Sequence, residues 1–191
     1  MSRGEQLLQE VDATVWVADV RDFSSLTDSL GPVELGLALG RFYEHVGGIL
    51  EGHRGRIVKF VGDAVLGVFI GGDHRLQALE AVAEAVAQRQ SFIDESGPRK
   101  LPVLDYVIGV ASGHVLAGEL GTDKLRFYDV LGQPVSQAFR ITALATRRNV
   151  SNLVDAGTWD GVKTPDRRPA AIETDAVELG ADKLRLFKLE G

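Results

Sequence analysis

The chain has 191 residues, and its 21 Lys and Arg against 27 Asp and Glu give a formal charge of −6. This acidic balance argues against a sequence-independent nucleic-acid surface, because such a surface needs a basic excess to displace counterions. The chain has no cysteine, which excludes disulfides, thiolate catalysis and cysteine-based metal sites. The length fits one domain with a sizeable core.

The beginning of the chain, MSRGEQLLQEVDA, lacks the apolar core of a signal peptide, and no run of residues approaches membrane-spanning length. We therefore expect a cytoplasmic protein with no membrane segment in this chain. Residues 1–11 are expected to form a short helix or a frayed lead-in.

Apolar periodicity and the Gly and Pro positions predict the elements that follow. In chain order they are a buried strand over 13–20, a helix from Gly31-Pro32 to about Gly52, a hairpin over 56–70 that turns at Gly62-Asp63, a helix over 74–94, a loop at 96–98, strands over 103–111 and 115–120, a strand over 125–130, a helix after Gly132, a strand over 150–154, a short helix over 156–162 and a strand hairpin that turns at 180–182. We expect one domain over 1–191, with a core over about 13–145 and a C-terminal extension over about 146–191.

The order of these elements predicts the fold class. Strand, helix, hairpin, helix and strand form a βαββαβ core, so we expect an α+β, ferredoxin-like antiparallel sheet with helices packed on one face and a C-terminal α/β extension. In that layout the end of the first strand lies beside the tip of the following hairpin. Asp19 and Asp63 should then meet.

Two carboxylates at strand ends, with no histidine or cysteine nearby, would form a hard-oxygen site suited to Mg²⁺ or Mn²⁺. Two such ions can clamp the attacking and leaving oxygens of a phosphoryl displacement. The alternative is structural: Asp19 caps the turn after its strand and Asp63 serves the hairpin turn. Spacing alone leaves both interpretations open. Asp22 is better explained as a helix cap than as a metal ligand.

Lys59 lies on a mostly apolar strand and is predicted to share a face with Ile57. A lysine in that position needs a partner or a function, unless it is a solvated residue of an edge strand.

Four stretches in order carry a family resemblance: WVADVRDFSSLT, GRIVKFVGDAVLGVF, YVIGVASGHVLAGELG and RFYDVLGQPVSQAFRI. They resemble the catalytic domain of class III nucleotidyl cyclases, the adenylate and guanylate cyclase family. The C-terminal LGADKLRLFKL is also similar to the last hairpin of that family. The resemblance implies a ferredoxin-like fold and head-to-tail dimers with active sites at the subunit interface.

Position by position, the resemblance implies that Asp19, Asp63 and the backbone carbonyl of Val20 bind two metal ions, Mg²⁺ or Mn²⁺. Lys59 matches the lysine that selects the base, and Asp129 matches its partner. In this family lysine with aspartate reads adenine, the lysine donating to N1 and the carboxylate accepting from the 6-amino group. Guanylate-specific members usually carry Glu and Cys at these two positions.

Arg140 matches the arginine that stabilises charge on the α-phosphate in the transition state. Two positions depart from the family pattern. Ser136 stands where the family normally has the Asn that orients the ribose, and Gln137 or water could compensate. At the C-terminal hairpin only Lys183 lies near the position of the lysine that commonly contacts the terminal phosphates.

The resemblance therefore implies an adenylate cyclase that converts ATP into 3′,5′-cyclic AMP and pyrophosphate as a head-to-tail homodimer. Its control could come from a regulatory domain or protein outside this chain. Two alternatives remain. One is a weak or inactive cyclase-like module that binds a nucleotide or a partner chain and regulates it, which Ser136 and the missing terminal lysine favour. The other is a cyclase for another nucleoside triphosphate.

Overall fold

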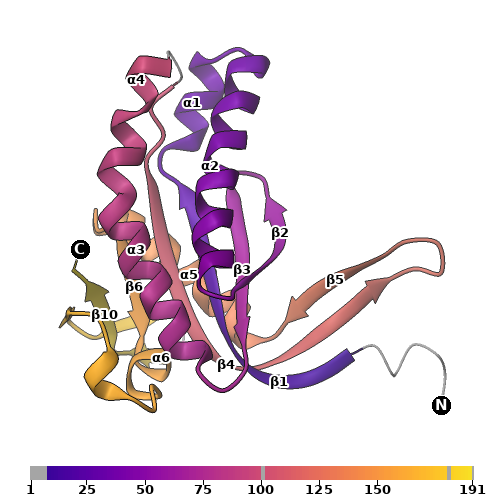
Figure 1. Ribbon diagram of the computed structural model, residues 1–191, viewed down its shortest axis with the longest axis vertical. Helices are drawn as coiled ribbons and strands as arrows, with labels where there is room; N and C mark the ends of the chain where they lie inside the picture. The colour runs from indigo at the N-terminus through magenta and orange to yellow at the C-terminus, as the bar shows by residue number, and fades with distance from the viewer. Residues whose placement is uncertain (1–7, 100–101, 180–181, 191) are drawn as a thin grey trace.

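The computed structural model describes residues 8–99, 102–179 and 182–190, and Figure 1 shows their arrangement. The elements are β1 (Leu8–Val20), α1 (Phe23–Ser29), α2 (Pro32–Gly52), β2 (Arg56–Val61), β3 (Ala64–Ile70), α3 (His74–Asp94), α4 (Ser96–Arg99), β4 (Tyr106–Gly121), β5 (Arg126–Leu131), α5 (Gln133–Arg147), β6 (Asn152–Asp155), α6 (Ala156–Asp160), a 3₁₀ turn (Pro165–Arg167), β7 (Ala171–Glu173), β8 (Val177–Leu179), β9 (Asp182–Leu184) and β10 (Leu186–Leu189). In the described part of the chain, no helix is both long and apolar enough to cross a bilayer.

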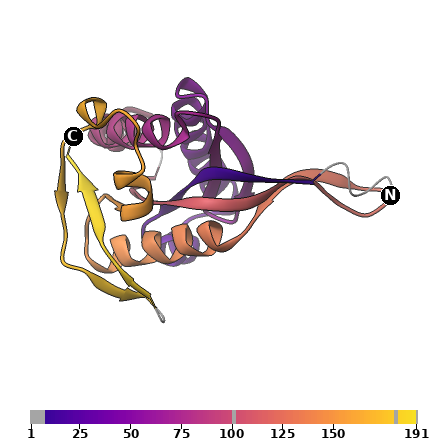
Figure 2. The same cartoon turned by 90° about the horizontal axis from the view of Figure 1, so that it is seen from below.

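The first four long strands form the predicted ferredoxin-like sheet. Their order is β2-β3-β1-β4, and each neighbouring pair is antiparallel. Figure 2 shows α2 and α3 on one face of this sheet and α5 on the other. The α+β fold class is therefore confirmed, with a third long helix covering the second face.

Alternation along β1 explains why both faces are covered. Trp16, Ala18 and Val20 point into the core under α2 and α3, whereas Val15 and Val17 point into the core under α5. A strand buried on both faces needs a nearly continuous apolar run. The sequence from 13 to 18 supplies one.

Gly109 lets α5 pack closely on β4. A Cβ atom at this position would lie 2.2 Å from Thr142 Oγ1 and 2.5 Å from the carbonyl oxygen of Ala138, both on α5. Only glycine fits this distance between helix and strand. The contact fixes α5, and with it the candidate residues Ser136 and Arg140, against the sheet.

The C-terminal segment continues the same sheet. Strand β6 pairs in parallel with β4, and β10 and β7 follow at that edge, whereas β8 and β9 form a separate two-stranded sheet. The second half of β4 pairs with β5 over Leu116–Gly121, and this β4–β5 arm projects from the body in both views (Figures 1 and 2).

Three local predictions were wrong. Residues 8–11 belong to β1 and not to a helix, because β1 pairs with β4 as far as Leu8; residues 1–7 lie outside the described residues. The two strands predicted around Gly113 are one strand, β4, because glycine adopts the required φ of +158° within it. Short helix α4 occupies the segment predicted as a loop at 96–98, whereas α1 directly follows Asp22, where a helix cap was predicted. Of the predicted 180–182 turn, residues 180–181 lie outside the described residues, although β8 and β9 pair on either side of it.

Candidate active site

Asp19 and Asp63 lie side by side where β1 ends and the β2–β3 hairpin turns. The antiparallel register places Asp19 opposite Ala64, and the backbone N–H of Val20 donates to the carbonyl oxygen of Asp63 at 3.3 Å. The turn itself depends on Gly62, which has a φ of +61°. The fold thus makes the contact that the topology predicted.

The surroundings of Asp19 shift the pKa of its carboxyl group. Burial raises the pKa of Asp19 to about 6, and the charge and hydrogen bond of Asp63 act in the same direction. Two carboxylates this close are difficult to ionise together without a cation. The pair therefore fits one or more hard divalent ions, with oxygen as the donor atom.

Arg21 anchors the backbone directly after Asp19 and Val20. Its Nε lies 3.1 Å from Asp105 Oδ2, its Nη2 donates to the Val150 carbonyl at 2.6 Å, and its backbone N–H donates to the Asp105 carbonyl at 2.8 Å. These contacts hold the segment that carries the Val20 carbonyl. This role could not be predicted from the sequence, because Asp105 and Val150 are distant from Arg21 in the chain.

Tyr43 supports the hairpin from α2. Its ring stacks on Phe60 of β2 at a centroid distance of 4.3 Å, and its hydroxyl donates to the carbonyl oxygen of Gly62. Burial, with a smaller contribution from the charge of Asp63, raises the pKa of the Tyr43 hydroxyl. Sequence reasoning missed Tyr43, for which the only signal was an aromatic residue on the helix before the hairpin.

Lys59 and Asp129 form an ion pair. Lys59 Nζ lies 2.7 Å from Asp129 Oδ2, and Asp129 Oδ1 accepts the backbone N–H of Val130 at 2.8 Å. The Asp129 side chain is 9% exposed and that of Lys59 38% exposed. The pair is thus open to solvent mainly from the lysine side.

Lys59 does not share a face with Ile57, contrary to the alternation predicted for this strand. The register between β2 and β3 shifts between Ile57 and Lys59, so Val58 is an extra residue. Ile57 packs under α2, whereas Val58 packs in the opposite core under α5. Lys59 follows Val58 onto the α5 side and reaches β5.

Ser136 and Arg140 lie one turn apart on α5, and both are exposed. Within the described part of the chain, neither side chain makes a hydrogen bond or an ion pair. Gln137, next to Ser136, donates through Nε2 to Asp155 Oδ2 at 3.2 Å. That amide is therefore engaged by β6, which argues against Gln137 replacing an asparagine at position 136.

The remaining candidates are placed as follows. Lys183 is exposed on β9, opposite Glu178 of β8. Asp22 stands at the start of α1 in a left-handed conformation with φ of +52°, but its side chain makes no capping hydrogen bond. Asp22 therefore stands at the predicted cap position but does not make the predicted capping hydrogen bond.

Within one chain the candidate residues lie in separate groups. No hydrogen bond or ion pair among the described side chains joins the Asp19–Asp63 pair to the Lys59–Asp129 pair, to Arg140 or to Lys183.

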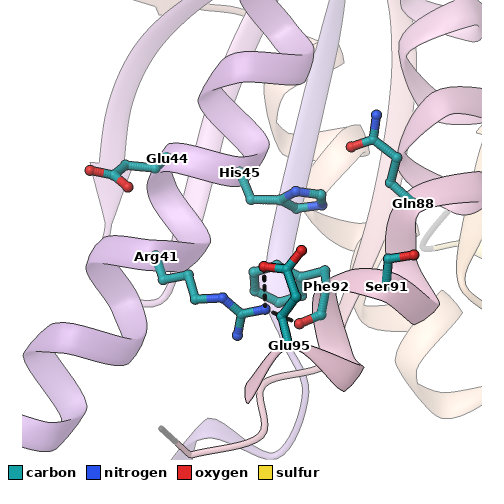
Figure 3. A pocket seen from close by; sticks show the side chains of 7 residues that line it. All are labelled: Arg41, Glu44, His45, Gln88, Ser91, Phe92 and Glu95. Carbon is teal, nitrogen blue, oxygen red and sulfur yellow. Dashed lines mark hydrogen bonds and ion pairs between the residues drawn. The ribbon is translucent and has the colours of Figure 1, made fainter. Parts of the chain in front are cut away.

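A cavity of about 480 Å³ lies elsewhere, between α2 and α3 (Figure 3). There His45 stacks on Phe92 and contacts the Tyr106 hydroxyl at 3.0 Å, which ties the two helices together. Its described lining residues include none of the candidates.

Comparison with known proteins identifies the family. The family model of the adenylate and guanylate cyclase catalytic domain matches residues 6–174, so the chain belongs to this family. Two uncharacterized proteins of Mycobacterium tuberculosis are similar in sequence. Rv1318c is 32% identical over 188 residues, which is 96% of this chain and 33% of that protein, and Rv1319c is 32% identical over 155 residues, which is 81% of this chain and 28% of that protein. The chain thus spans about a third of the length of these relatives.

Solved cyclase structures share the fold. The adenylyl cyclase CyaB from P. aeruginosa superimposes with a TM-score of 0.84 at 19% identity, covering 96% of both chains. The guanylyl cyclase Cya2 superimposes with a TM-score of 0.84 at 21% identity, covering 97% of this chain and 94% of that chain. The predicted family is therefore confirmed, and the fold is equally close to adenylyl and guanylyl cyclases.

The pKa of Asp19 predicts how metal-free stability depends on pH. Because its pKa is about 6 in the folded chain and 3.8 ordinarily, the folded state holds this proton more tightly than the unfolded state does. The contribution of Asp19 to the free energy of unfolding therefore falls as pH rises from about 4 to about 6. In EDTA at pH 8, Asp19→Asn should raise the free energy of unfolding by about 1–2 kcal/mol after allowance for partial exposure, and the gain should vanish near pH 4.

Urea unfolding at several pH values measures this effect. Asp123→Asn is the matched control, because the Asp123 side chain is fully exposed, and it should leave the free energy of unfolding within about 0.5 kcal/mol of the wild type. A variant Asp19→Asn that is less stable than the wild type at pH 8 would contradict the repulsion between Asp19 and Asp63.

Proposed function

We propose that this chain is an adenylate cyclase, which forms 3′,5′-cyclic AMP and pyrophosphate from ATP at the interface of a head-to-tail homodimer. Membership of the cyclase family supports the reaction class. The separation of the candidates into groups within one chain supports a site completed by a second copy. One chain supplies Asp19 and Asp63, and its partner supplies Lys59, Asp129 and Arg140.

The observation that carries the choice of ATP is the Lys59–Asp129 pair at 2.7 Å. It presents a cationic donor beside a carboxylate acceptor. Adenine offers the complementary pattern, with an acceptor at N1 and a donor at the 6-amino group. Guanine reverses both, with a donor at N1 and an acceptor at O6, so each polar group of the pocket would face a mismatched partner.

The Asp19 and Asp63 carboxylates and the Val20 carbonyl would hold two Mg²⁺ or Mn²⁺ ions. When bound, these ions neutralise charge on the phosphates and lower the pKa of the attacking 3′-hydroxyl. The residues of the chain then act by position. Lys59 and Asp129 hold the base, Ser136 hydrogen-bonds near the ribose, and the Arg140 guanidinium stabilises the charge that develops on the α-phosphate oxygens.

Lys183 would contact the terminal phosphates from the β8–β9 hairpin. Its exposure leaves the ammonium group accessible to an anion. As a point charge on a flexible side chain, lysine suits a phosphate without imposing one geometry. Its contribution is to triphosphate affinity and not to the bond that breaks.

A second function has a specific observation in its favour. Ser136 replaces the family's asparagine, and the amide of the neighbouring Gln137 is engaged by Asp155 at 3.2 Å. A site that binds nucleotide but orients the ribose poorly would serve as a regulatory module. The two functions differ in product formation and not in binding.

Product formation separates these functions. We expect cyclic AMP from ATP, and much less cyclic product from GTP, CTP or UTP, with Mg²⁺ or Mn²⁺. Asp63→Ala should lower kcat by about 10³-fold, because metal stabilisation of phosphoryl transfer is worth several kcal/mol. The measurement is chromatography of the products from each nucleotide.

The control is retention of fold and nucleotide binding. Circular dichroism should show that Asp63→Ala is folded. No cyclic product from any nucleotide, in a preparation that is folded, dimeric and shown to bind ATP, would contradict the cyclase and support the regulatory module. Preferential formation of another cyclic nucleotide would contradict the choice of ATP alone.

Replacing Ser136 with the asparagine usual in the family should increase kcat. Ser136→Asn should raise kcat for ATP by about two- to tenfold, because it adds one hydrogen bond to the ribose worth roughly 0.5–1.5 kcal/mol. Ser136→Ala is the matched control and should lower kcat or leave it unchanged. Steady-state kinetics with ATP measure both, and a slower Ser136→Asn enzyme would show that the ribose is held differently here.

A further inference from the structure

Side-chain contacts hold β5 next to β2. In the sheet, β3, β1 and β4 lie between these two strands, and β5 pairs through its backbone with β4. The β4–β5 arm projects from the body (Figure 1). The position of Asp129 relative to Lys59 therefore depends on the side-chain contacts between β2 and β5.

Arg56 and Tyr128 make a second contact between these strands. The guanidinium carbon of Arg56 lies 3.6 Å from the centre of the Tyr128 ring. Arg56 pairs with Val68, whose side chain faces the core under α5, and Tyr128 packs against the same core together with Val58. The stacked pair thus lies on the sheet face that carries Lys59.

The Lys59–Asp129 pair would also have to serve the base. Asp129 Oδ1 accepts the N–H of Val130 and Oδ2 accepts Lys59, so a 6-amino group would share these oxygens with donors of the chain. A base bound here would use the same groups that join Lys59 to Asp129. The Arg56–Tyr128 contact uses neither group and can persist while the base is bound.

We propose that Arg56 is a positioning residue for base recognition. Stacked on Tyr128, it fixes β5 over β2 and so sets the position of Asp129 relative to Lys59. This inference rests on the proposed function. A planar guanidinium stacks on an aromatic ring better than an ammonium does, which makes arginine the suitable residue at position 56.

Base selectivity and exchange of β5 amides test the proposal together. Arg56→Gln and Tyr128→Leu should each lower the ratio of kcat/KM for ATP to kcat/KM for GTP by roughly two- to fivefold, mainly through KM for ATP. Both should speed hydrogen exchange of amides in 126–131. In the double variant the ATP/GTP ratio should fall little further than in either single variant, because each substitution removes the same contact.

Conservative variants separate positioning from loss of fold. Tyr128→Phe keeps the ring and should keep both the ATP/GTP ratio and the slow exchange. The ATP/GTP ratio and the exchange rate of Arg56→Lys should lie between those of the wild type and of Arg56→Gln. Arg126→Gln is the matched control on the same strand, since the one ion pair of Arg126 among the described residues is a long, exposed pair with Asp123 at 3.9 Å. It should leave the ratio unchanged.

The exchange measurement also keeps this inference distinct from the proposed function. If the wild type forms no cyclic nucleotide, the proposed function fails, and exchange in 126–131 still decides whether Arg56 holds the arm. Unchanged exchange in Arg56→Gln would overturn the proposal. An equal loss of kcat/KM for ATP and for GTP in Arg56→Gln would also overturn it, since Arg56 would then have no effect on base selectivity.

Discussion

The carboxylates of Asp19 and Asp63 occupy one small volume at the end of the sheet, and their repulsion must be offset by the rest of the fold. The pairing of β1 with β3 forces them together, since Asp19 stands opposite Ala64 and the Val20 amide binds the Asp63 carbonyl. Backbone hydrogen bonds and two buried cores supply the stabilisation that keeps the pair in place. In the proposed function, this carboxylate pair would bind divalent cations, which would offset the repulsion.

The groups that would act on the nucleotide lie on other elements. Lys59 and Asp129 join β2 to β5, and Ser136 and Arg140 lie on the exposed side of α5. In the proposed dimer, each chain offers its metal pair to one site and its base pocket and arginine to the other. This division makes activity depend on association, because neither half can position ATP and neutralise its phosphates alone.

Much of this arrangement could be predicted from the sequence because it depends on element order and strand alternation. The βαββαβ order fixes the β2-β3-β1-β4 sheet, and the sheet brings Asp19 to Asp63. The bulge at Val58, which turns Lys59 toward β5, could not be predicted from a period of two. Nor could the contacts of Arg21 with Asp105 or of Gln137 with Asp155, because these are side-chain contacts between segments whose separation in the chain gives no local signal.

Complementation between two inactive variants tests the shared site most directly. Asp63→Ala removes a proposed metal ligand and Arg140→Ala removes the arginine proposed to bind the α-phosphate, and each variant alone should form almost no cyclic AMP. A dimer of the two keeps one intact site, so an equal mixture allowed to exchange subunits should regain about a quarter of the wild-type rate per chain. An equal mixture that stays inactive while mixed dimers form, or a variant that is active alone, would contradict the division of the site between two chains.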